Sequence, residues 1–210
     1  MAELTACCVL RSGGPLYEPR WVIRLRNNVR RFAPAHRFVA LSDVDVPGVE
    51  TIPLKHDWPR WWPILEVFRP GLFSGRVLYL DLADLVVWNM APFFKGKGFT
   101  IAPDPWEPGP GRFASGVMAF DAGDSALYQQ FVPLAGPTIT RLHGDQDWIT
   151  ELRADAQTFD KRLCASYRGQ CRDTDSIPRG ARIVLCHGRP KPDVIREPWF
   201  RERWDRDWPA

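Results

Sequence analysis

The sequence predicts an α/β fold with a mixed, mostly parallel central sheet flanked by helices. Short apolar runs alternate with segments of helical period, and one of the runs ends on an acid, Asp81. This alternation is typical of layered α/β domains, in which ligands bind beyond the carboxyl ends of the strands. The 210 residues, 45% hydrophobic and 25% charged, suit a single globular domain.

The first quarter of the chain contains the clearest elements. Residues 4–10 (LTACCVL) are almost unbroken in their apolar character, which predicts a buried strand ended by the turn signal SGG. Within residues 18–32, apolar side chains recur at helical spacing and the opposite face is basic, so we expect a helix. Residues 37–41 and 49–54 predict the second and third strands.

The rest of the chain continues the alternation. We expect strands at residues 76–81, 85–87, 99–102, 116–120 and 183–187, and helices at residues 124–134 and 145–154. Strands that point the same way end at the same edge of a sheet, so the polar residues that follow them should converge. These residues are Arg11, Ser12, Ser42, Asp43, Asp81 and His187.

The last residues differ from the rest in composition. We expect residues 1–192 to form the domain and residues 193–210, rich in Trp and Arg, to be a tail that packs on it or extends from it. Such a tail could stack on single-stranded nucleic acid or present itself to a protein partner. More often, arginine stems cover aromatic faces in a packing segment. The net charge of +3 is too small to argue for nucleic acid.

The sequence indicates a cytoplasmic protein. Its N-terminus lacks the basic start and long apolar run of a signal peptide, and no stretch approaches the ~18–20 apolar residues of a membrane span. We therefore expect reduced thiols at the five cysteines, which are Cys7, Cys8, Cys164, Cys171 and Cys186. The seven-residue spacing of Cys164 and Cys171 matches zinc sites poorly.

The strongest local signal is RVLYLDLADLVV, residues 76–87. An apolar strand that delivers acids to its carboxyl end is one way in which enzymes hold a divalent cation against phosphates, because hard cations take oxygen ligands. The acid could equally cap the end of the strand or a following turn. Both interpretations stay open on the motif alone.

This segment resembles the strand and DxD motif of family 8-type GT-A glycosyltransferases, in which Leu-Tyr-Leu-Asp is followed by x-Asp. Three later segments are similar to motifs of that family and follow its order: FASGVM (113–118), GDQD (144–147) and VLCHGRPKP (184–192). The LRS of residues 10–12 is similar to the nucleotide-binding end of its first strand. The resemblance implies a GT-A-like nucleotide-diphospho-sugar transferase fold.

The resemblance also implies a function. The chain would transfer a sugar from a nucleotide-diphosphate donor, a UDP-sugar, to an unknown acceptor, with retention of configuration and with Mn²⁺ or Mg²⁺ as cofactor. Asp81 and His187 would bind the metal, and Asp145 or Gln146 would be catalytic by holding sugar or acceptor hydroxyls. The expected donor-binding residues are Leu10, Arg11, Ser12, Ser42, Asp43, Ser115, Gly116, Gly188 and Lys191, the last at the β-phosphate.

The sequence departs from the family pattern at three polar positions. The second acid of DxD falls on Ala83, and Asp84 could replace it as a metal ligand only if the backbone turns there. Ala114 stands where an asparagine is frequent, and Pro63-Ile64 stand where relatives commonly carry a lysine. A second hypothesis is therefore a degenerate member that binds a nucleotide, a protein or a nucleic acid without transferring sugar.

Each candidate residue also has an ordinary structural interpretation. His187 could be a satisfied histidine at a strand end, Asp145 a helix N-cap and Lys191 a solvated surface lysine. The tryptophans of WPRWW, residues 58–62, could stack on a sugar ring or a base. The functional interpretation gains weight only if the structure brings these residues to one place.

Overall fold

Seven strands form the central sheet of the computed structural model, which describes residues 4–14, 16–33, 36–105, 109 and 111–209. They are β1 (Leu4–Leu10), β2 (Arg37–Ser42), β3 (Glu50–Pro53), β4 (Arg76–Leu80), β6 (Thr100–Pro103), β7 (Phe113–Asp121) and β8 (Gln157–Thr158). The strand order is β3-β2-β1-β4-β7-β6-β8, and β7 runs against its neighbours while the other pairs are parallel. The predicted mixed, mostly parallel sheet is confirmed.

A smaller sheet lies beside the central one. It contains β5 (Leu85–Val86), β10 (Ile183–Leu185) and β9 (Cys164–Ser166), with β10 in the middle. The sequence analysis expected residues 183–187 to end at the edge of the main sheet, and in this respect it was wrong. The strand pairs instead with β5, which begins directly after Asp84, so the two sheets meet at the end of β4.

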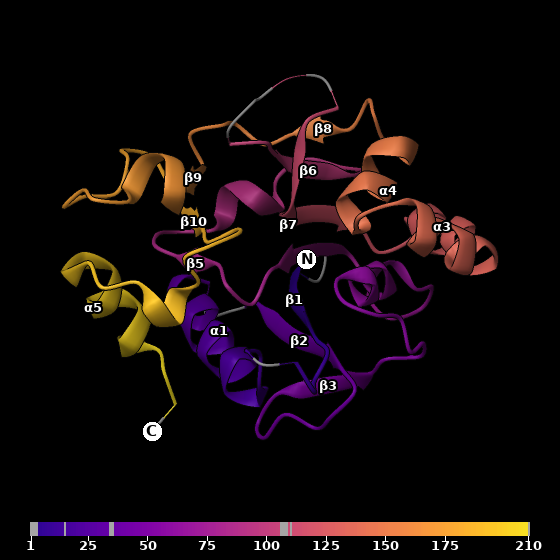
Figure 1. Cartoon of the computed structure of the whole chain (residues 1–210), viewed down its shortest axis with the longest axis horizontal. Helices are drawn as coiled ribbons and strands as arrows, with labels where there is room; N and C mark the ends of the chain where they lie inside the picture. Colours follow the sequence, from indigo (N-terminus) through magenta and orange to yellow (C-terminus); the bar gives the residue numbers. More distant parts are fainter. Residues whose placement is uncertain (1–3, 15, 34–35, 106–108, 110, 210) are drawn as a thin grey trace.

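Helices cover both faces of the central sheet. They are α1 (Pro19–Phe32), α2 (Ala126–Phe131), α3 (Ala135–Arg141), α4 (Asp145–Leu152) and α5 (Pro198–Arg206). There are also short 3₁₀ helices, η1 (Trp62–Phe68), η2 (Ala91–Phe94), η3 (Val132–Leu134) and η5 (Pro192–Val194), and one π-helical turn, η4 (Tyr167–Cys171). In Figure 1, α1 and α5 lie to the left of the sheet, and α3 and α4 lie to the right.

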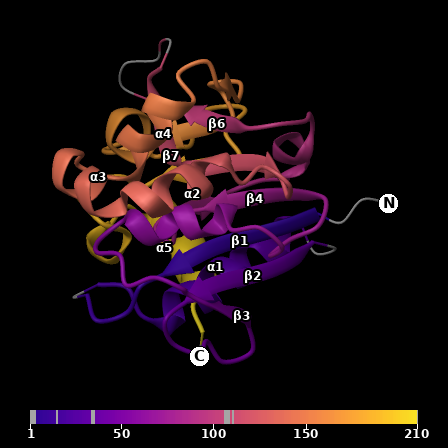
Figure 2. The same ribbon diagram turned by 90° about the vertical axis from the view of Figure 1, so that its right-hand side faces the viewer.

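The two layers follow from the alternation of side chains along β1. Cys8 and Leu10 pack with α1 on one face, whereas Cys7 and Val9 pack with η1, α2 and α4 on the other. Because both faces are buried, the strand is apolar at consecutive positions rather than at alternate ones. Figure 2 shows β4, β1, β2 and β3 side by side in this order.

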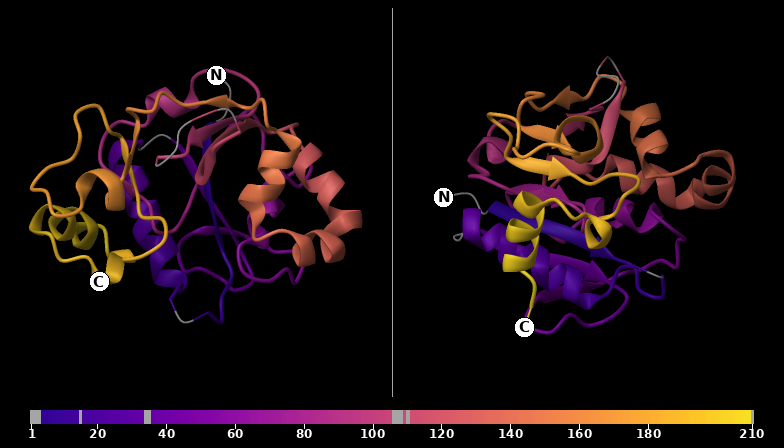
Figure 3. Two further views of the ribbon diagram at one scale, coloured as in Figure 1. Left: turned by 45° about the horizontal axis from the view of Figure 1, so that its top comes forward. Right: turned by 60° about the vertical axis from the view of Figure 1, so that its left-hand side comes forward.

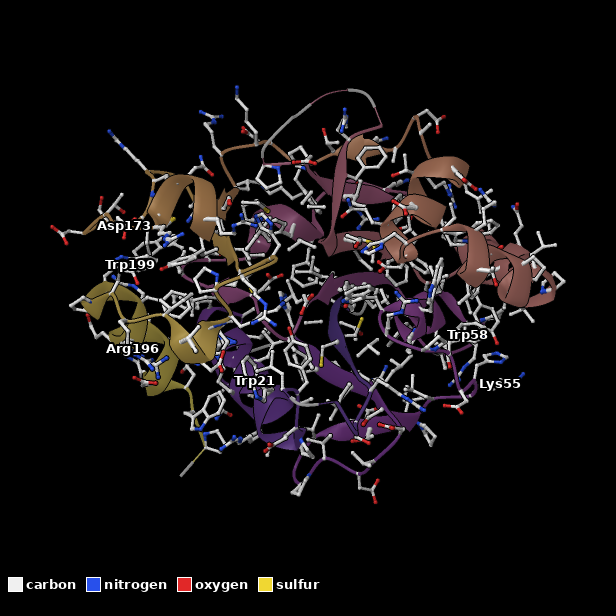
Figure 4. All side chains as sticks on the ribbon, viewed as in Figure 1. Trp21, Lys55, Trp58, Asp173, Arg196 and Trp199 are labelled. Carbon is white, nitrogen blue, oxygen red and sulfur yellow. The ribbon has the colours of Figure 1, made fainter. Side chains whose placement is uncertain are left out.

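The C-terminal segment folds back onto α1. The Trp204 ring lies edge-on to Trp21 at 5.4 Å between centroids, and the Asp207 carboxylate accepts hydrogen bonds from Asn28 and Arg31. Figure 3 shows α5 alongside α1, and Figure 4 places Trp21 on the same side of the molecule as Trp199. Trp199 and Trp204 are buried, so their rings are covered by this packing.

The described helices include none that is both long and apolar enough to cross a bilayer.

Candidate functional site

The chain turns sharply where β4 ends, over residues 81–84, which we call the acid turn. The Asp84 N–H donates to the Asp81 carbonyl over 3.0 Å, and the Ala83 N–H donates to Asp81 Oδ1 over 3.1 Å. These bonds close a β-turn and bring Asp84 back towards Asp81. The turn that Asp84 needs in order to replace the missing acid is therefore present.

The two acids of this turn face Gly116 on β7. The Asp81 N–H donates to the Gly116 carbonyl over 2.9 Å. A Cβ atom at Gly116 would lie 3.5 Å from Asp84 Oδ2 and 3.7 Å from the Asp81 Cβ. Asp84 is buried, its Oδ2 has no hydrogen-bond partner, and burial, followed by the charge of Asp81, raises its pKa well above the usual value. Two close carboxylates with an unsatisfied oxygen favour a cation.

A cavity of about 380 Å³ opens beside the acid turn. It is lined from the end of β4, the start of β7, the start of α4 and the loop after β10. Nine of the residues predicted from the sequence line it: Asp81, Asp84, Ser115, Gly116, Asp145, Gln146, His187, Gly188 and Lys191. These nine lie together, but of the six strand-end residues that were expected to converge only Asp81 and His187 are among them.

A second, smaller cavity of about 90 Å³ adjoins the first. Asp81, Lys191 and Trp61 line both cavities, while Arg11 and Tyr17 line only the smaller one. The Lys191 ammonium lies 5.7 Å from the centre of the Tyr17 ring. This lysine and the first acid of the turn therefore both lie where the two cavities meet.

The remaining predicted residues join the ends of β1 and β2. Ser12 donates from its N–H and from its hydroxyl to the two Asp43 carboxylate oxygens, each over 2.8 Å. Arg11 lies 3.5 Å from Asp43 and also pairs with an acid at position 57. Leu10 and Ser42 are buried, and the Ser42 hydroxyl accepts the backbone N–H two residues later. Leu10, Ser12, Ser42 and Asp43 are not among the residues that line either cavity.

Asp145 is a buried acid at the start of α4. Its Oδ2 has no hydrogen-bond partner. Burial raises the pKa of Asp145 to about 7; the charge of Asp81 adds to the shift, and a hydrogen bond from the Ser115 side chain opposes it. Gln146 accepts the Ser115 N–H over 3.3 Å. The Asp147 carboxylate accepts the backbone N–H of His143, just before the helix, and the N-cap is Gly144, so Asp145 is not the N-cap residue.

His187 and Gly188 form the opposite wall of the cavity. His187 Nε2 lies 2.9 Å from the Ser166 hydroxyl, and burial, together with the charge of Arg168, lowers the pKa of His187. Gly188 has a φ of +70°, and a Cβ atom there would lie 2.9 Å from Arg168 Nη1. Position 188 therefore favours glycine because of its backbone conformation, and the end of the Arg168 side chain would have to shift to admit a Cβ atom.

Asp81 and Asp84 fit a divalent cation, but the third predicted ligand is not assembled with them. Within the described residues, no three His, Cys, Asp or Glu side chains are grouped closely enough to hold a metal ion. His187 instead pairs with Ser166. The unsatisfied, buried Asp84 oxygen beside Asp81 supports a two-carboxylate site, because Mg²⁺ is commonly held by one or two carboxylates together with substrate phosphates.

The three tryptophans of residues 58–62 separate into two kinds. Trp58 and Trp62 are buried in the core, whereas Trp61 is 45% exposed. A Cβ atom at Gly144 would lie 3.5 Å from Trp61 Cε3, so the indole borders the start of α4. Arg60, the preceding residue, has a φ of +54°, an uncommon conformation for a residue other than glycine.

Sequence reasoning missed two residues of α1, one that holds the acid turn and one that holds the strand directly after it. Arg24 is fully buried and donates from Nη1 and Nη2 to the Asp84 carbonyl over 2.8 and 2.9 Å. Asn28 accepts the Val86 N–H and donates to its carbonyl over 2.7 and 2.9 Å. The signal was present, because positions 24 and 28 fall on the same helical face as the buried Trp21 and Leu25.

Comparisons with known proteins show which solved structures share this fold. No family model matches the sequence, and no curated protein is significantly similar to it. Among solved structures, the glycosyltransferase GlyE of Streptococcus pneumoniae TIGR4 superposes with a TM-score of 0.75 at 14% identity, over 99% of this chain and 62% of GlyE. The galactosyltransferase LgtC, solved with donor and acceptor sugar analogues, gives 0.71 at 12% identity, over 97% and 94% of the two chains.

A third structure extends the same class. Mouse xyloside xylosyltransferase 1 superposes with a TM-score of 0.55 at 13% identity, over 89% of this chain and 98% of the mouse protein. This chain thus spans nearly all of LgtC but only 62% of GlyE. At these identities the similarity concerns the fold, which is the GT-A glycosyltransferase fold.

Proposed function

We propose that this chain is a family 8-type glycosyltransferase that moves a sugar from a UDP-sugar to an acceptor hydroxyl. The observation that carries the proposal is the acid turn, which sets Asp81 and Asp84 side by side over Gly116 at the wall of the larger cavity. Such a pair, at the carboxyl end of a strand in a GT-A fold, suits a cation that is shared with a diphosphate.

The donor diphosphate would lie between the acid turn and Lys191. Asp81 and Asp84 would hold Mn²⁺ or Mg²⁺; when bound, this cation supplies positive charge that stabilises the departing diphosphate. Lys191 lies at the junction of the two cavities and adds a compact positive charge there. His187 could ligate the cation through Nε2 only by giving up its contact with Ser166.

The sugar would occupy the larger cavity between β7 and α4. Gly116 leaves space next to the acids, and Ser115 presents its backbone there. The unpartnered carboxylate oxygen of Asp145 would accept a sugar hydroxyl, and Gln146 would bind a second one. The UDP-linked donor and the retaining stereochemistry are what the resemblance to family 8 implies.

Calorimetry of UDP and UDP-sugars, with and without Mn²⁺, tests the proposal. The wild type should bind UDP more tightly with Mn²⁺, and Asp81→Asn should lose that enhancement. Asp175→Asn is the matched control, because Asp175 is an exposed acid outside both cavities. If the wild type binds none of UDP, GDP and ADP, the proposed function is wrong and only the similarity of fold remains.

A degenerate, nucleotide-binding protein is the second candidate function. Ala83 at the second DxD position favours it, and so does the lack of a three-ligand metal group among the described residues. UDP binding that does not respond to Mn²⁺, with no release of UDP from UDP-sugars, would support this candidate over the transferase.

A further inference from the structure

Arg24 is a buried arginine whose charge is held without a carboxylate partner. In the described part of the chain, its hydrogen bonds all go to the Asp84 carbonyl, over 2.8 and 2.9 Å. The guanidinium carbon lies 3.4 Å from the centroid of the Trp204 ring on α5. Burying a cation is costly unless its partners are well placed, so these contacts indicate a specific task.

The carbonyl that Arg24 holds belongs to the second acid of the turn. The amide of Asp84 is bonded to Asp81, and its carbonyl is bonded to Arg24, so the peptide groups on both sides of its side chain are fixed. Asn28, one helical turn from Arg24, holds both backbone groups of Val86. Helix α1 therefore holds the backbone at Asp84 and at Val86, and the Asp84 carboxylate itself is held by backbone hydrogen bonds at Asp81 and Cys186.

Helix α5 and the residue just beyond it contact both Arg24 and Asn28. Trp204, which covers the Arg24 guanidinium, is itself buried and stacks on Phe200 at 5.5 Å. The Asp207 carboxylate, just beyond this helix, accepts a hydrogen bond from Asn28 over 2.9 Å. Trp204 is not among the residues that line the cavities, although it belongs to the same hydrophobic cluster as Ala83 and Cys186, which do line the larger one. Among the described residues that hold the Asp84 backbone, Trp204 contacts Arg24.

We propose that Arg24 is a positioning residue for the acid turn, and that the C-terminal helix acts on the candidate site through it. The inference rests on the proposed function, since it assigns Arg24 to the orientation of a cation-binding carboxylate. The indole face fixes the plane of the guanidinium so that both Nη atoms point at one oxygen. Without that face, the arginine gains other rotamers, the carbonyl is released, and Asp84 can leave its place beside Asp81.

The test measures the affinity for UDP with and without Mn²⁺. Arg24→Lys keeps the charge but cannot make the forked hydrogen bond. We expect it to leave metal-free UDP binding unchanged and to reduce the Mn²⁺ enhancement about tenfold, as for other residues that orient metal ligands. Trp204→Leu should give a similar loss from outside the cavity, and Trp204→Phe, which retains an aromatic face, should restore most of it.

Two matched controls separate a loss of carboxylate positioning from a general loss of stability. Arg30→Lys changes an exposed arginine on the same helix, and Trp88→Leu removes an exposed tryptophan that lines neither cavity. Both should keep the full Mn²⁺ enhancement. The ratio of UDP dissociation constants without and with Mn²⁺ is measured on folded protein, so a lower Tm alone does not change it.

The double variant Arg24→Lys/Trp204→Leu completes the design. If Trp204 acts through Arg24, the double variant should lose no more enhancement than the larger single loss. An enhancement that survives in Arg24→Lys and Trp204→Leu overturns the inference and leaves the proposed function standing. A wild type without any enhancement overturns the metal-dependent function and the inference with it. If Arg24→Lys does not fold, Trp204→Leu and Trp204→Phe decide the matter.

Discussion

The Asp84 amide donates a hydrogen bond to the Asp81 carbonyl over 3.0 Å, and this single turn places the second acid beside the first. A spacing of DxxD thereby brings two acids together, because a β-turn returns position i+3 towards position i. The result is a buried carboxyl group with an unsatisfied oxygen. A group of that kind is unfavourable for folding and useful for binding.

Asp84→Asn should separate these two effects. Burial and the charge of Asp81 raise the pKa of Asp84, so its ionised form destabilises the native state at pH 7. The neutral amide should stabilise the metal-free protein by about 1 kcal/mol, in the range of substitutions that relieve strained sites. The same change should abolish the Mn²⁺ enhancement of UDP binding. Urea unfolding and calorimetry on the same preparation measure both quantities.

Gly116 and Gly188 should respond differently to alanine. At Gly116 the new Cβ atom would make ordinary contacts of 3.5 and 3.7 Å with the two acids, so the fold should tolerate it. At Gly188 it would lie 2.9 Å from Arg168 and meet a positive φ, which should destabilise the protein by about 1–2 kcal/mol.

Thermal melting and UDP-sugar binding measure this pair. Gly116→Ala should keep its Tm and bind UDP-sugar less well relative to UDP, because the methyl group occupies space proposed for the sugar. Gly123→Ala, which meets nothing within 4 Å, is the control for both. A large fall in Tm for Gly116→Ala would mean that this glycine is needed for packing.

The main sheet was predictable because its signals are local. Residues 4–10 are apolar on both faces, and the helix of residues 19–32 carries an apolar stripe. Helix α3 was missed since Gly136 and Pro137 stand within it, and α5 was missed because its apolar residues are spread among arginines. These elements depend on tertiary packing, which outweighs weak local preference.

The candidate site was predictable in part. Asp81, Asp145 and His187 were found from motifs, and the structure brings all three to one cavity. Whether Asp84 could join Asp81 depended on a turn that one sequence could not decide. Arg24 was not singled out, because the pattern of its helix predicted only an apolar stripe with a basic opposite face, yet Arg24 is fully buried. The roles of these residues, and the domain boundary at residue 192, stay predictions.

Asp145 should make stability depend on pH near neutrality. Burial raises the pKa of Asp145 to about 7 in the folded protein, above its value in the unfolded chain. The native state therefore binds more protons than the unfolded state between about pH 4 and pH 7, so stability should fall as the pH rises through that window. Asp145→Asn should reduce the slope without removing it, because the pKa of the buried Asp84 is raised as well. Urea melts of the metal-free wild type and variant from pH 4 to pH 8 measure the free energy of unfolding at each pH. The same pH dependence in both proteins would mean that Asp145 titrates normally.

Trp61 should contribute to binding and little to stability. It is 45% exposed and lines both cavities, so truncation leaves the core intact while removing an aromatic surface from the proposed donor site. Trp61→Ala should weaken UDP-sugar binding by about 1 kcal/mol, the usual scale of an aromatic contact, and leave the Tm nearly unchanged. Trp88→Ala is the matched control, because Trp88 is 61% exposed and lines neither of these cavities. Calorimetry decides between two outcomes: equal affinities in the two variants would remove Trp61 from the site, whereas a loss confined to Trp61→Ala would place the donor against its indole ring.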